Sequence, residues 1–311
     1  MGVLVYVLGR SGTGKSYSMR NFDKNTLGVV NVQGKILPFK GSGNIETVNT
    51  DQSDEIVRAI TKLSGSYKSI VVDDYQYVMA NEFMRRSTER GYDKFTEIAR
   101  HAWDIADCVR KLPNDVIVYI MCHTDTDAEG TERLKTIGKL LDEKICLEGM
   151  STIVLKTNVS DGQYSFLTQN NGKDTVKSPA GMFPSYAIDN DLKYVDEKIR
   201  HYYELGKFLT DDEIAEIDEA AKKDDIPIDT GEKKRRGRKK ADETPAPVKE
   251  EKSEEEAPKR RTRKKVEEET PTEELPKRKV RTTEDKTPVE EPKQVETAEA
   301  APVRRRRRVA E

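Results

Sequence analysis

The sequence predicts an α/β fold in which helices cover both faces of a mostly parallel β-sheet, giving three layers with a β-hairpin at the late edge of the sheet. Apolar, strand-like runs alternate with amphipathic segments over residues 1–208, and this alternation is typical of βαβ units. Their crossovers are expected to be right-handed. The composition changes sharply near residue 226, so the folded part is expected to end before that point.

The first strand is predicted at residues 3–8, an apolar run that leads through a glycine-rich segment into a short helix at about 15–22. Two further short strands are expected at residues 28–33 and 35–39, around the Gln33-Gly34 turn. The glycine-rich segment therefore lies directly between a strand and a helix.

Residues 51–63 predict a helix, because apolar residues recur there at helical spacing and acidic residues occupy the first turn. A buried strand is expected at 69–73, followed by one or two helices over 75–111 that end before Pro113. The next apolar run predicts a strand at 115–122. These elements continue the alternation of strand and helix.

The remaining elements complete the predicted domain. Apolar spacing predicts a helix at 132–146. Residues 151–157 and 163–168 predict the two strands of a hairpin around a Ser-Asp-Gly turn. Helices are expected at 191–205 and, as a short acidic helix, at about 210–222.

Residues 9–16 match G-x-x-x-x-G-K-S, the phosphate-binding P-loop, in the strand-to-helix context that the motif requires. Glycines let backbone N–H groups curl around phosphate oxygens, and the helix N-terminus favours an anion. Lys15 is expected to reach the β- and γ-phosphates and Ser16 to ligate Mg²⁺. The predicted nucleotide-binding residues are Gly9, Arg10, Ser11, Gly12, Thr13, Gly14, Lys15 and Ser16.

A second motif carries two carboxylates to the end of the strand at 69–73. Residues 69–74 read Ser-Ile-Val-Val-Asp-Asp, which is the Walker B pattern, and α/β sheets place their ligands at this strand edge. Asp73 is expected to hold Mg²⁺, in part through water. Asp74 is expected to orient or deprotonate an attacking water.

The strand at 115–122 ends in His123-Thr124. A polar residue at this point can sense the γ-phosphate, and His123 could do so as a hydrogen-bond donor; the alternative is an ordinary loop residue. Residues 124–130 are polar and turn-rich, and they are predicted to form a mobile loop.

The C-terminal segment cannot form a packed core. Residues 226–311 contain no aromatic residue, hold nine of the 13 prolines, and carry 26 Lys and Arg with 21 Asp and Glu. Such a chain is expected to be disordered. The predicted organisation is a core at 1–208, a short helix and linker at 209–225, and a polyampholyte tail at 226–311. The tail's basic clusters lie at 233–240, 259–265, 277–281 and 304–308.

The rest of the charge lies in the core: residues 1–225 hold 29 basic and 36 acidic side chains, a net charge of −7 against +5 for the tail.

The three cysteines, Cys108, Cys122 and Cys146, show neither metal spacing nor a disulfide framework and predict buried, reduced thiols. Neither a secretory leader nor an apolar run of membrane-spanning length is present. The sequence therefore predicts a cytoplasmic protein that does not cross a membrane.

Over residues 1–205 the chain resembles the small RecA-core ATPases of bacteriophages, which are grouped with phage AAA-type nucleotide-binding proteins and single-strand-annealing recombinases. The resemblance rests on residues 9–16, residues 69–74, the strand ending at His123-Thr124, and a block at 166–183 followed by 188–192. It implies ATP- and Mg²⁺-dependent work on single-stranded DNA in recombination or replication. No segment matches the N-terminal polymerisation arm of RecA, which argues against RecA-type filaments.

The resemblance also implies partners. The ATP site of such proteins often lies between subunits of a homo-oligomer, where a neighbour's basic residue contacts the γ-phosphate; Lys156, Arg133 and Lys135 are the candidates, although surface cations are usually just solvated. Single-stranded DNA would contact the loop at 124–130 and the basic clusters of the tail. The protein would act in the cytoplasm of the host cell.

Two functions remain open at this point. The first is a DNA-stimulated ATPase. The second is a nucleotide-binding accessory module that acts through a protein partner with little DNA contact, in which case the tail is a solubilising spacer whose glutamates neutralise its basic clusters. A kinase is less favoured, because no arginine-rich lid segment follows the strand at 115–122 and the second carboxylate of residues 69–74 suits hydrolysis.

Overall fold

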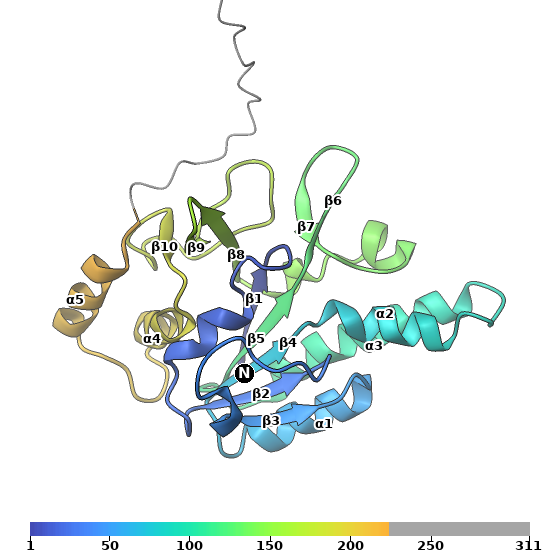
Figure 1. Cartoon of the computed structure of the whole chain (residues 1–311), viewed down its shortest axis with the longest axis horizontal. Coiled ribbons are helices and arrows are strands. Elements are labelled where there is room, and N and C mark those ends of the chain that lie inside the picture. Colours follow the sequence, from blue (N-terminus) through green and yellow to red (C-terminus); the bar gives the residue numbers. More distant parts are fainter. Residues whose placement is uncertain (224–311) are drawn as a thin grey trace, which may run out of the picture. The chain divides into compact units, whose positions relative to one another are not determined.

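A mostly parallel, eight-stranded sheet forms the centre of this computed structural model, which describes residues 1–223 (Figure 1). The strand order is β10-β9-β8-β1-β5-β4-β2-β3, and the six strands from β8 to β3 run parallel to one another. β9 and β10 continue the sheet through antiparallel pairs. The strands are β1 Val3–Leu8, β2 Leu27–Asn31, β3 Glu46–Asn49, β4 Ser69–Asp73, β5 Ile117–Cys122, β8 Ile153–Ser160, β9 Gln163–Leu167 and β10 Ala187–Asp189.

Helices cover both faces of the sheet, as the sequence predicts. Side chains alternate between the two faces along a strand, so Leu4, Tyr6 and Leu8 of β1 pack in the core under α1, α2 and α3, whereas Val5 and Val7 pack in the core under η1 and α4. The helices are η1 Ser16–Asn21, α1 Ser53–Leu63, α2 Gln76–Arg85, α3 Asp93–Cys108, α4 Leu192–Tyr203 and α5 Asp211–Ala221.

The register of the parallel strands aligns their carboxyl ends. Leu8 at the end of β1 pairs with Cys122 at the end of β5, and Val72 of β4 pairs with Ile120 of the same strand. The loop after β1, the two carboxylates at the end of β4 and the histidine after β5 consequently meet at one edge of the sheet.

Most predicted elements are confirmed. These are the strands at β1, β2, β4, β5, β8 and β9, the helices at α1, α2, α3, α4 and α5, and the short helix after the glycine-rich segment, which is a 3₁₀-helix. The tail predicted at 226–311 lies outside the described residues.

Residues 35–39 do not form the predicted strand. Both neighbours of β2, namely β3 and β4, are parallel to it, so no position beside β2 remains for the returning strand of a hairpin. The edge position belongs to β3, which the sequence analysis missed. Residues 35–38 line the carboxyl edge of the sheet instead.

The loop predicted at 124–130 is in part a β-strand, because β6 (Thr124–Thr126) pairs with β7 (Glu132–Leu134) and the residues between them form the hairpin turn. Its mobility stays a prediction. The Asp127 side chain closes the turn. Its Oδ1 accepts hydrogen bonds from the backbone N–H groups of Glu129 (3.0 Å) and Thr131 (2.8 Å).

No continuous helix spans residues 132–146. The first three of them belong to β7, and Gly138 has a φ of +97° and packs against Phe95. Only a short π-helix, η4 (Leu140–Lys144), follows. Leu134 and Leu141 are still buried in the core. Apolar residues of this segment therefore pack inward without forming the helix that their spacing predicts.

Cysteine burial is confirmed for Cys108 and Cys122, whereas Cys146 is exposed, contrary to the prediction. Of the helices in residues 1–223, none has the length and apolar character needed to cross a membrane.

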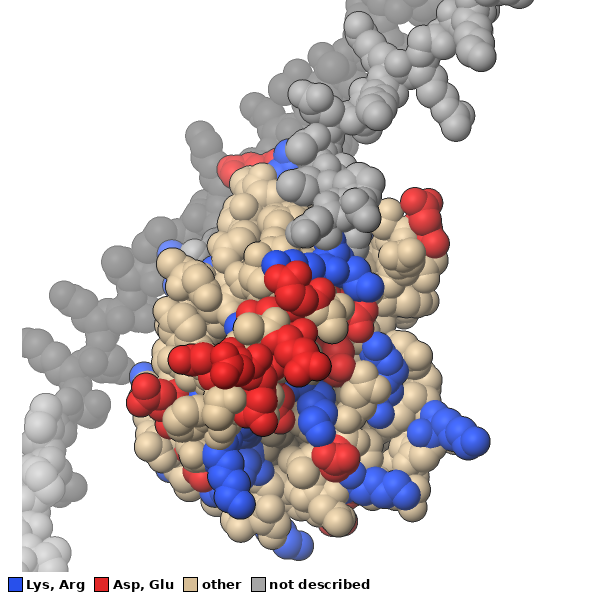
Figure 2. Space-filling view, turned by 90° about the vertical axis from the view of Figure 1, so that its left-hand side faces the viewer, with Lys and Arg blue, Asp and Glu red and all other residues tan. Residues whose placement is uncertain are grey.

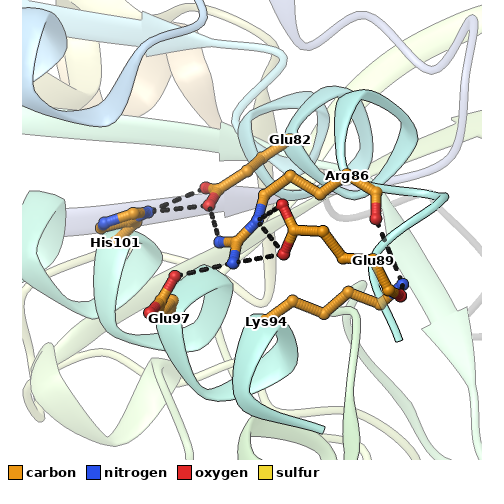
Figure 3. Close-up of polar contacts among 6 residues, drawn as sticks. All are labelled: Glu82, Arg86, Glu89, Lys94, Glu97 and His101. Atoms are coloured by element: carbon orange, nitrogen blue, oxygen red, sulfur yellow. Dashed lines mark hydrogen bonds and ion pairs between the residues drawn. The ribbon is translucent and has the colours of Figure 1, made fainter. Parts of the chain in front are cut away.

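A polar cluster joins the end of α2 to α3 (Figure 3). The Arg86 guanidinium forms ion pairs with Glu82 (3.0 Å), Glu89 (2.8 Å) and Glu97 (2.7 Å), and His101 contacts Glu82. The cluster fixes α2, which begins just after the β4 carboxylates, against the longest helix of the described chain.

A second, buried cluster joins α4 to the opposite edge of the sheet. Asp196 accepts hydrogen bonds from Ser69 Oγ (2.8 Å), Tyr119 OH (2.9 Å) and Arg200 Nε (2.6 Å), and Asp196 and Arg200 are both buried. Arg200 also donates to the carbonyl oxygens of Lys68 and Asp115. Asp196 therefore balances a guanidinium that links two strands.

We expect Asp196→Ala to lower the free energy of unfolding by about 3 to 5 kcal/mol, because the Arg200 charge would stay buried without its partner. Chemical denaturation monitored by circular dichroism measures this. Glu197→Gln, which removes the neighbouring carboxylate but keeps the Asp196 hydrogen bonds, is the matched control. Equal losses in the two variants would contradict this role of Asp196.

Candidate functional site

The loop of residues 9–16 leaves β1 and enters η1 at the carboxyl edge of the sheet. Two of its glycines are required by close contacts. A Cβ on Gly9 would lie 1.8 Å from Thr157 Oγ1, and one on Gly14, whose φ is +95°, would lie 2.8 Å from the Tyr164 ring. The glycines thus let the loop pass tightly between β1, β8 and β9.

Lys15 folds back into this loop. Its Nζ donates hydrogen bonds to the carbonyl oxygens of Gly9 (2.7 Å) and Arg10 (2.9 Å), and the side chain is buried. Burial lowers the Lys15 pKa, while the nearby Asp73 and Asp74 carboxylates act in the opposite direction. The ammonium group is therefore a buried cation whose present partners are neutral carbonyl groups.

Asp73, the last residue of β4, lies against the start of η1. Ser16 Oγ donates a hydrogen bond of 2.7 Å to Asp73 Oδ2. The other oxygen, Oδ1, is buried and has no hydrogen-bond partner within residues 1–223. Burial, opposed by the Ser16 hydrogen bond and assisted by the neighbouring Asp74 carboxylate, raises the Asp73 pKa to about 6.

This donor set fits Mg²⁺. The ion prefers oxygen ligands, keeps several waters, and is commonly held by one or two protein groups together with substrate phosphates. Ser16 Oγ and the unpartnered Asp73 Oδ1 are suitable donors. The described chain contains no group of three or more His, Cys, Asp or Glu side chains that could hold a metal ion.

Asp74 sits just beyond the strand with a φ of +63°, a conformation that aspartate tolerates better than most residues. Lys35 Nζ lies 2.7 Å from its Oδ2, and His123 Nε2 lies 3.7 Å from its Oδ1. Gln76 Nε2 lies 3.5 Å from the same Oδ1. The second carboxylate is thus surrounded by three polar side chains.

His123 is placed by Gln76, whose Oε1 accepts a hydrogen bond of 3.1 Å from the His123 backbone N–H. The imidazole packs edge-on to Tyr77. Burial, followed by the Lys15 charge, lowers the His123 pKa. The ring is therefore neutral at physiological pH, where one of its nitrogens donates and the other accepts.

These side chains line a cleft of about 490 Å³, a size typical of small-ligand sites. Residues 35–38 form part of its lining, together with Tyr17 and Tyr164, whose ring centroids are 6.3 Å apart. The predicted site residues found in this cleft are Ser11, Gly12, Gly14, Lys15, Ser16, Asp73, Asp74 and His123.

Gly9, Arg10 and Thr13 line a different cleft, of about 750 Å³, on the other side of the loop. Lys156 also lies there, where its Nζ pairs with Asp174 (2.9 Å) and Glu132 (3.1 Å). Arg133 and Lys135 belong to the β6–β7 hairpin and its continuation, close to Asp127 and Asp125. A role for these three cations at a neighbouring subunit's site stays a prediction.

Sequence reasoning missed Lys35 and Gln76. Gln76 opens α2 two residues after Asp74, a position that could have been noticed from spacing. Lys35 carries no such signal, because it reaches Asp74 only through the pairing of Asn31 in β2 with Asp73 in β4.

The raised Asp73 pKa predicts a pH-dependent stability for the protein without nucleotide or metal. A carboxyl with a folded-state pKa near 6, against about 4 when unfolded, costs stability increasingly as pH rises from 4 to 6, up to about 3 kcal/mol. Asp73→Asn should therefore gain stability relative to the native chain across this interval and keep the gain above it. Denaturant titrations in EDTA at several pH values measure the difference; a difference that is constant with pH would contradict the assignment.

Comparison with known proteins does not assign a function to this site. A scan against protein-family models gives no match, and a search of curated proteins gives no significant match. The function is argued below from the residues themselves.

Proposed function

We propose that the chain binds Mg²⁺ and ATP in the 490 Å³ cleft and hydrolyses the nucleotide, on a RecA-like P-loop core. One observation carries the proposal: a buried lysine, a hydroxyl group and a buried carboxylate with an unpartnered oxygen converge at the carboxyl edge of a parallel sheet, in one cleft. Such edges are where α/β sheets bind their ligands. The sequence G-x-x-x-x-G-K-S supplies the same assignment independently.

The side chains have distinct parts in binding. Lys15 would exchange its two carbonyl partners for phosphate oxygens, which gives a buried cation an anionic partner. Ser16 and Asp73 would hold Mg²⁺, and the bound ion would neutralise phosphate charge. The glycines of the loop let backbone N–H groups approach the phosphates.

Asp74 and His123 are the groups proposed for hydrolysis. Asp74 would orient a water molecule and accept its proton, as an acidic residue next to a terminal phosphate can do. The neutral His123 ring, 3.7 Å from Asp74, would donate a hydrogen bond to the γ-phosphate and report its presence to β6, which begins at the next residue.

We further propose that ATP hydrolysis drives an action on single-stranded DNA in recombination or replication, in the host-cell cytoplasm. The resemblance to the phage ATPases implies this role. The β6–β7 hairpin is a poor phosphate-binding element, because residues 124–134 carry Asp125, Asp127, Glu129 and Glu132 against Arg133. DNA contact is therefore assigned to the basic clusters beyond residue 226. An ATP site shared between subunits of a homo-oligomer belongs to the same proposal.

The charge of the folded part supports a second candidate, a nucleotide-binding module that acts through a protein partner. Figure 2 shows acidic side chains gathered on the face that carries α5 in Figure 1. The exposed acidic residues of this helix are Asp211, Asp212, Glu213, Glu216 and Glu219. This face would repel DNA and could attract a basic protein.

Two substitutions test the nucleotide proposal. We expect Lys15→Ala to abolish tight Mg·ATP binding, because it removes the buried cation from the phosphate site. Asp74→Asn should keep ATP bound and slow turnover by a factor on the order of 10² or more, as expected for loss of a water-positioning base. Calorimetric binding and phosphate-release assays, with and without single-stranded DNA, measure both.

Circular dichroism of each variant is the control for folding. Native ATP affinity in a folded Lys15→Ala variant would contradict the proposed phosphate site. Unchanged turnover in Asp74→Asn would leave nucleotide binding intact and refute hydrolysis through this carboxylate.

A chain ending at residue 225 tests the DNA proposal. We expect it to hydrolyse ATP, to bind single-stranded DNA more weakly than the full chain, and to show a flatter dependence of log affinity on log salt, because fewer counterions are released. The loss should be nearly independent of base sequence. Fluorescence titrations at several salt concentrations decide between the candidates: equal slopes for the two chains would favour the module that acts through a protein partner.

A further inference from the structure

Lys35 is the basic side chain nearest to the proposed water-positioning carboxylate. Its Nζ lies 2.7 Å from Asp74 Oδ2 and 5.1 Å from the centre of the Tyr77 ring. Within residues 1–223, Lys15 and Lys35 are the lysine or arginine side chains that line the 490 Å³ cleft. Lys15 donates its hydrogen bonds to carbonyl groups of the glycine-rich loop, whereas Lys35 forms an ion pair with Asp74.

The backbone around Lys35 is held firmly in place. The N–H of Val32 extends the β2–β4 pairing to the Asp73 carbonyl oxygen (3.2 Å), and Gly34, with a φ of +62°, turns the chain back over the sheet edge. The buried Asn31 side chain then donates a hydrogen bond of 2.6 Å to the Lys35 carbonyl oxygen. These contacts fix where the Lys35 side chain begins.

The side chain itself is free to change partner. It is 60% exposed, whereas the Asp74 side chain is 12% exposed. The hydrogen bond to Asp74 raises the Lys35 pKa, so the amine is protonated. A long, solvated lysine that pairs with a fixed carboxylate can be drawn to a stronger anion nearby at little entropic cost.

A nucleoside triphosphate would bring such an anion into the cleft. Its terminal phosphate would add negative charge beside Asp73 and Asp74, and like charges in a partly buried site repel strongly. A phosphate oxygen also competes better than a carboxylate shared with His123 and Gln76 for an ammonium donor. Moving Lys35 from Asp74 to the phosphate would remove that repulsion and uncover Asp74.

We propose that Lys35 contacts the terminal phosphoryl group of the bound nucleoside triphosphate: it neutralises Asp74 when the cleft is empty and transfers its hydrogen bond to the γ-phosphate when the nucleotide binds. This inference rests on the proposed nucleotide site. The ammonium stays protonated throughout, so only hydrogen-bond partners change. Charge stabilisation on the γ-phosphate would then come from the same chain, independently of any cation from a neighbouring subunit.

Binding of a diphosphate and of a triphosphate analogue separates this contact from general nucleotide binding. We expect Lys35→Ala to weaken binding of a non-hydrolysable Mg·ATP analogue roughly tenfold or more, as for loss of a charge-assisted hydrogen bond, and to leave Mg·ADP binding unchanged. Its kcat should fall by a factor on the order of 10², as for loss of a preorganised donor. Lys35→Arg, which keeps the charge, should retain most of the analogue affinity.

Lys40→Ala is the matched control, because Lys40 is an exposed lysine further along the same segment, and it should bind and hydrolyse as the native chain does. Equal losses for ADP and the triphosphate analogue in Lys35→Ala would overturn the contact and assign Lys35 to structure. Faster hydrolysis would overturn it too, because Lys35 would then only mask Asp74. A native chain that binds neither nucleotide would refute the nucleotide site itself, whereas native nucleotide binding that Lys35→Ala does not alter would refute the Lys35 contact alone.

Discussion

The register of the four parallel strands β1, β5, β4 and β2 is the constraint on which the candidate site depends. β2, β4 and β5 are buried along their whole length and β1 over all but its first residue, with helices on both faces. A slip of one residue would turn every apolar side chain toward the wrong core. The same pairing that protects the core therefore fixes the relative positions of the glycine-rich loop, both carboxylates and His123, which come from three different strands.

Electrostatics at this edge is unbalanced in a way that favours a charged ligand. Lys15 is buried against neutral carbonyl groups, and Asp73 keeps a buried oxygen without a partner in the described chain. Buried charges are normally paired or bound to metals. The pKa shifts of Lys15 and Asp73 have the same main physical origin, burial. The proposed phosphate and Mg²⁺ would give each of these side chains a partner of opposite charge.

Charge is also divided along the chain. The described part is acidic, with a hairpin and a helical face rich in Asp and Glu, while the basic clusters lie beyond residue 226. A folded domain with such a surface would hold a polyanion poorly by itself. Under the proposed function, any attachment to DNA would be supplied by a segment separate in sequence from the candidate nucleotide cleft, and its strength would vary with salt.

Local sequence determined the α/β class, the glycine-rich loop, the pair of carboxylates at the end of β4 and most helices. Each of these depends on a short run of residues that must bury one face or make one tight turn. Where the local pattern is compatible with two conformations, only the tertiary structure decided between them. The apolar residues of 132–146 lie in a β-strand, around a turn at Gly138 and in a short π-helix rather than in one continuous helix. Residues 35–39 do not form a strand, because β3 occupies the position beside β2 and runs parallel to it. Lys35 could reach Asp74 only through strand register, and spacing along a chain does not specify which parallel strands become neighbours.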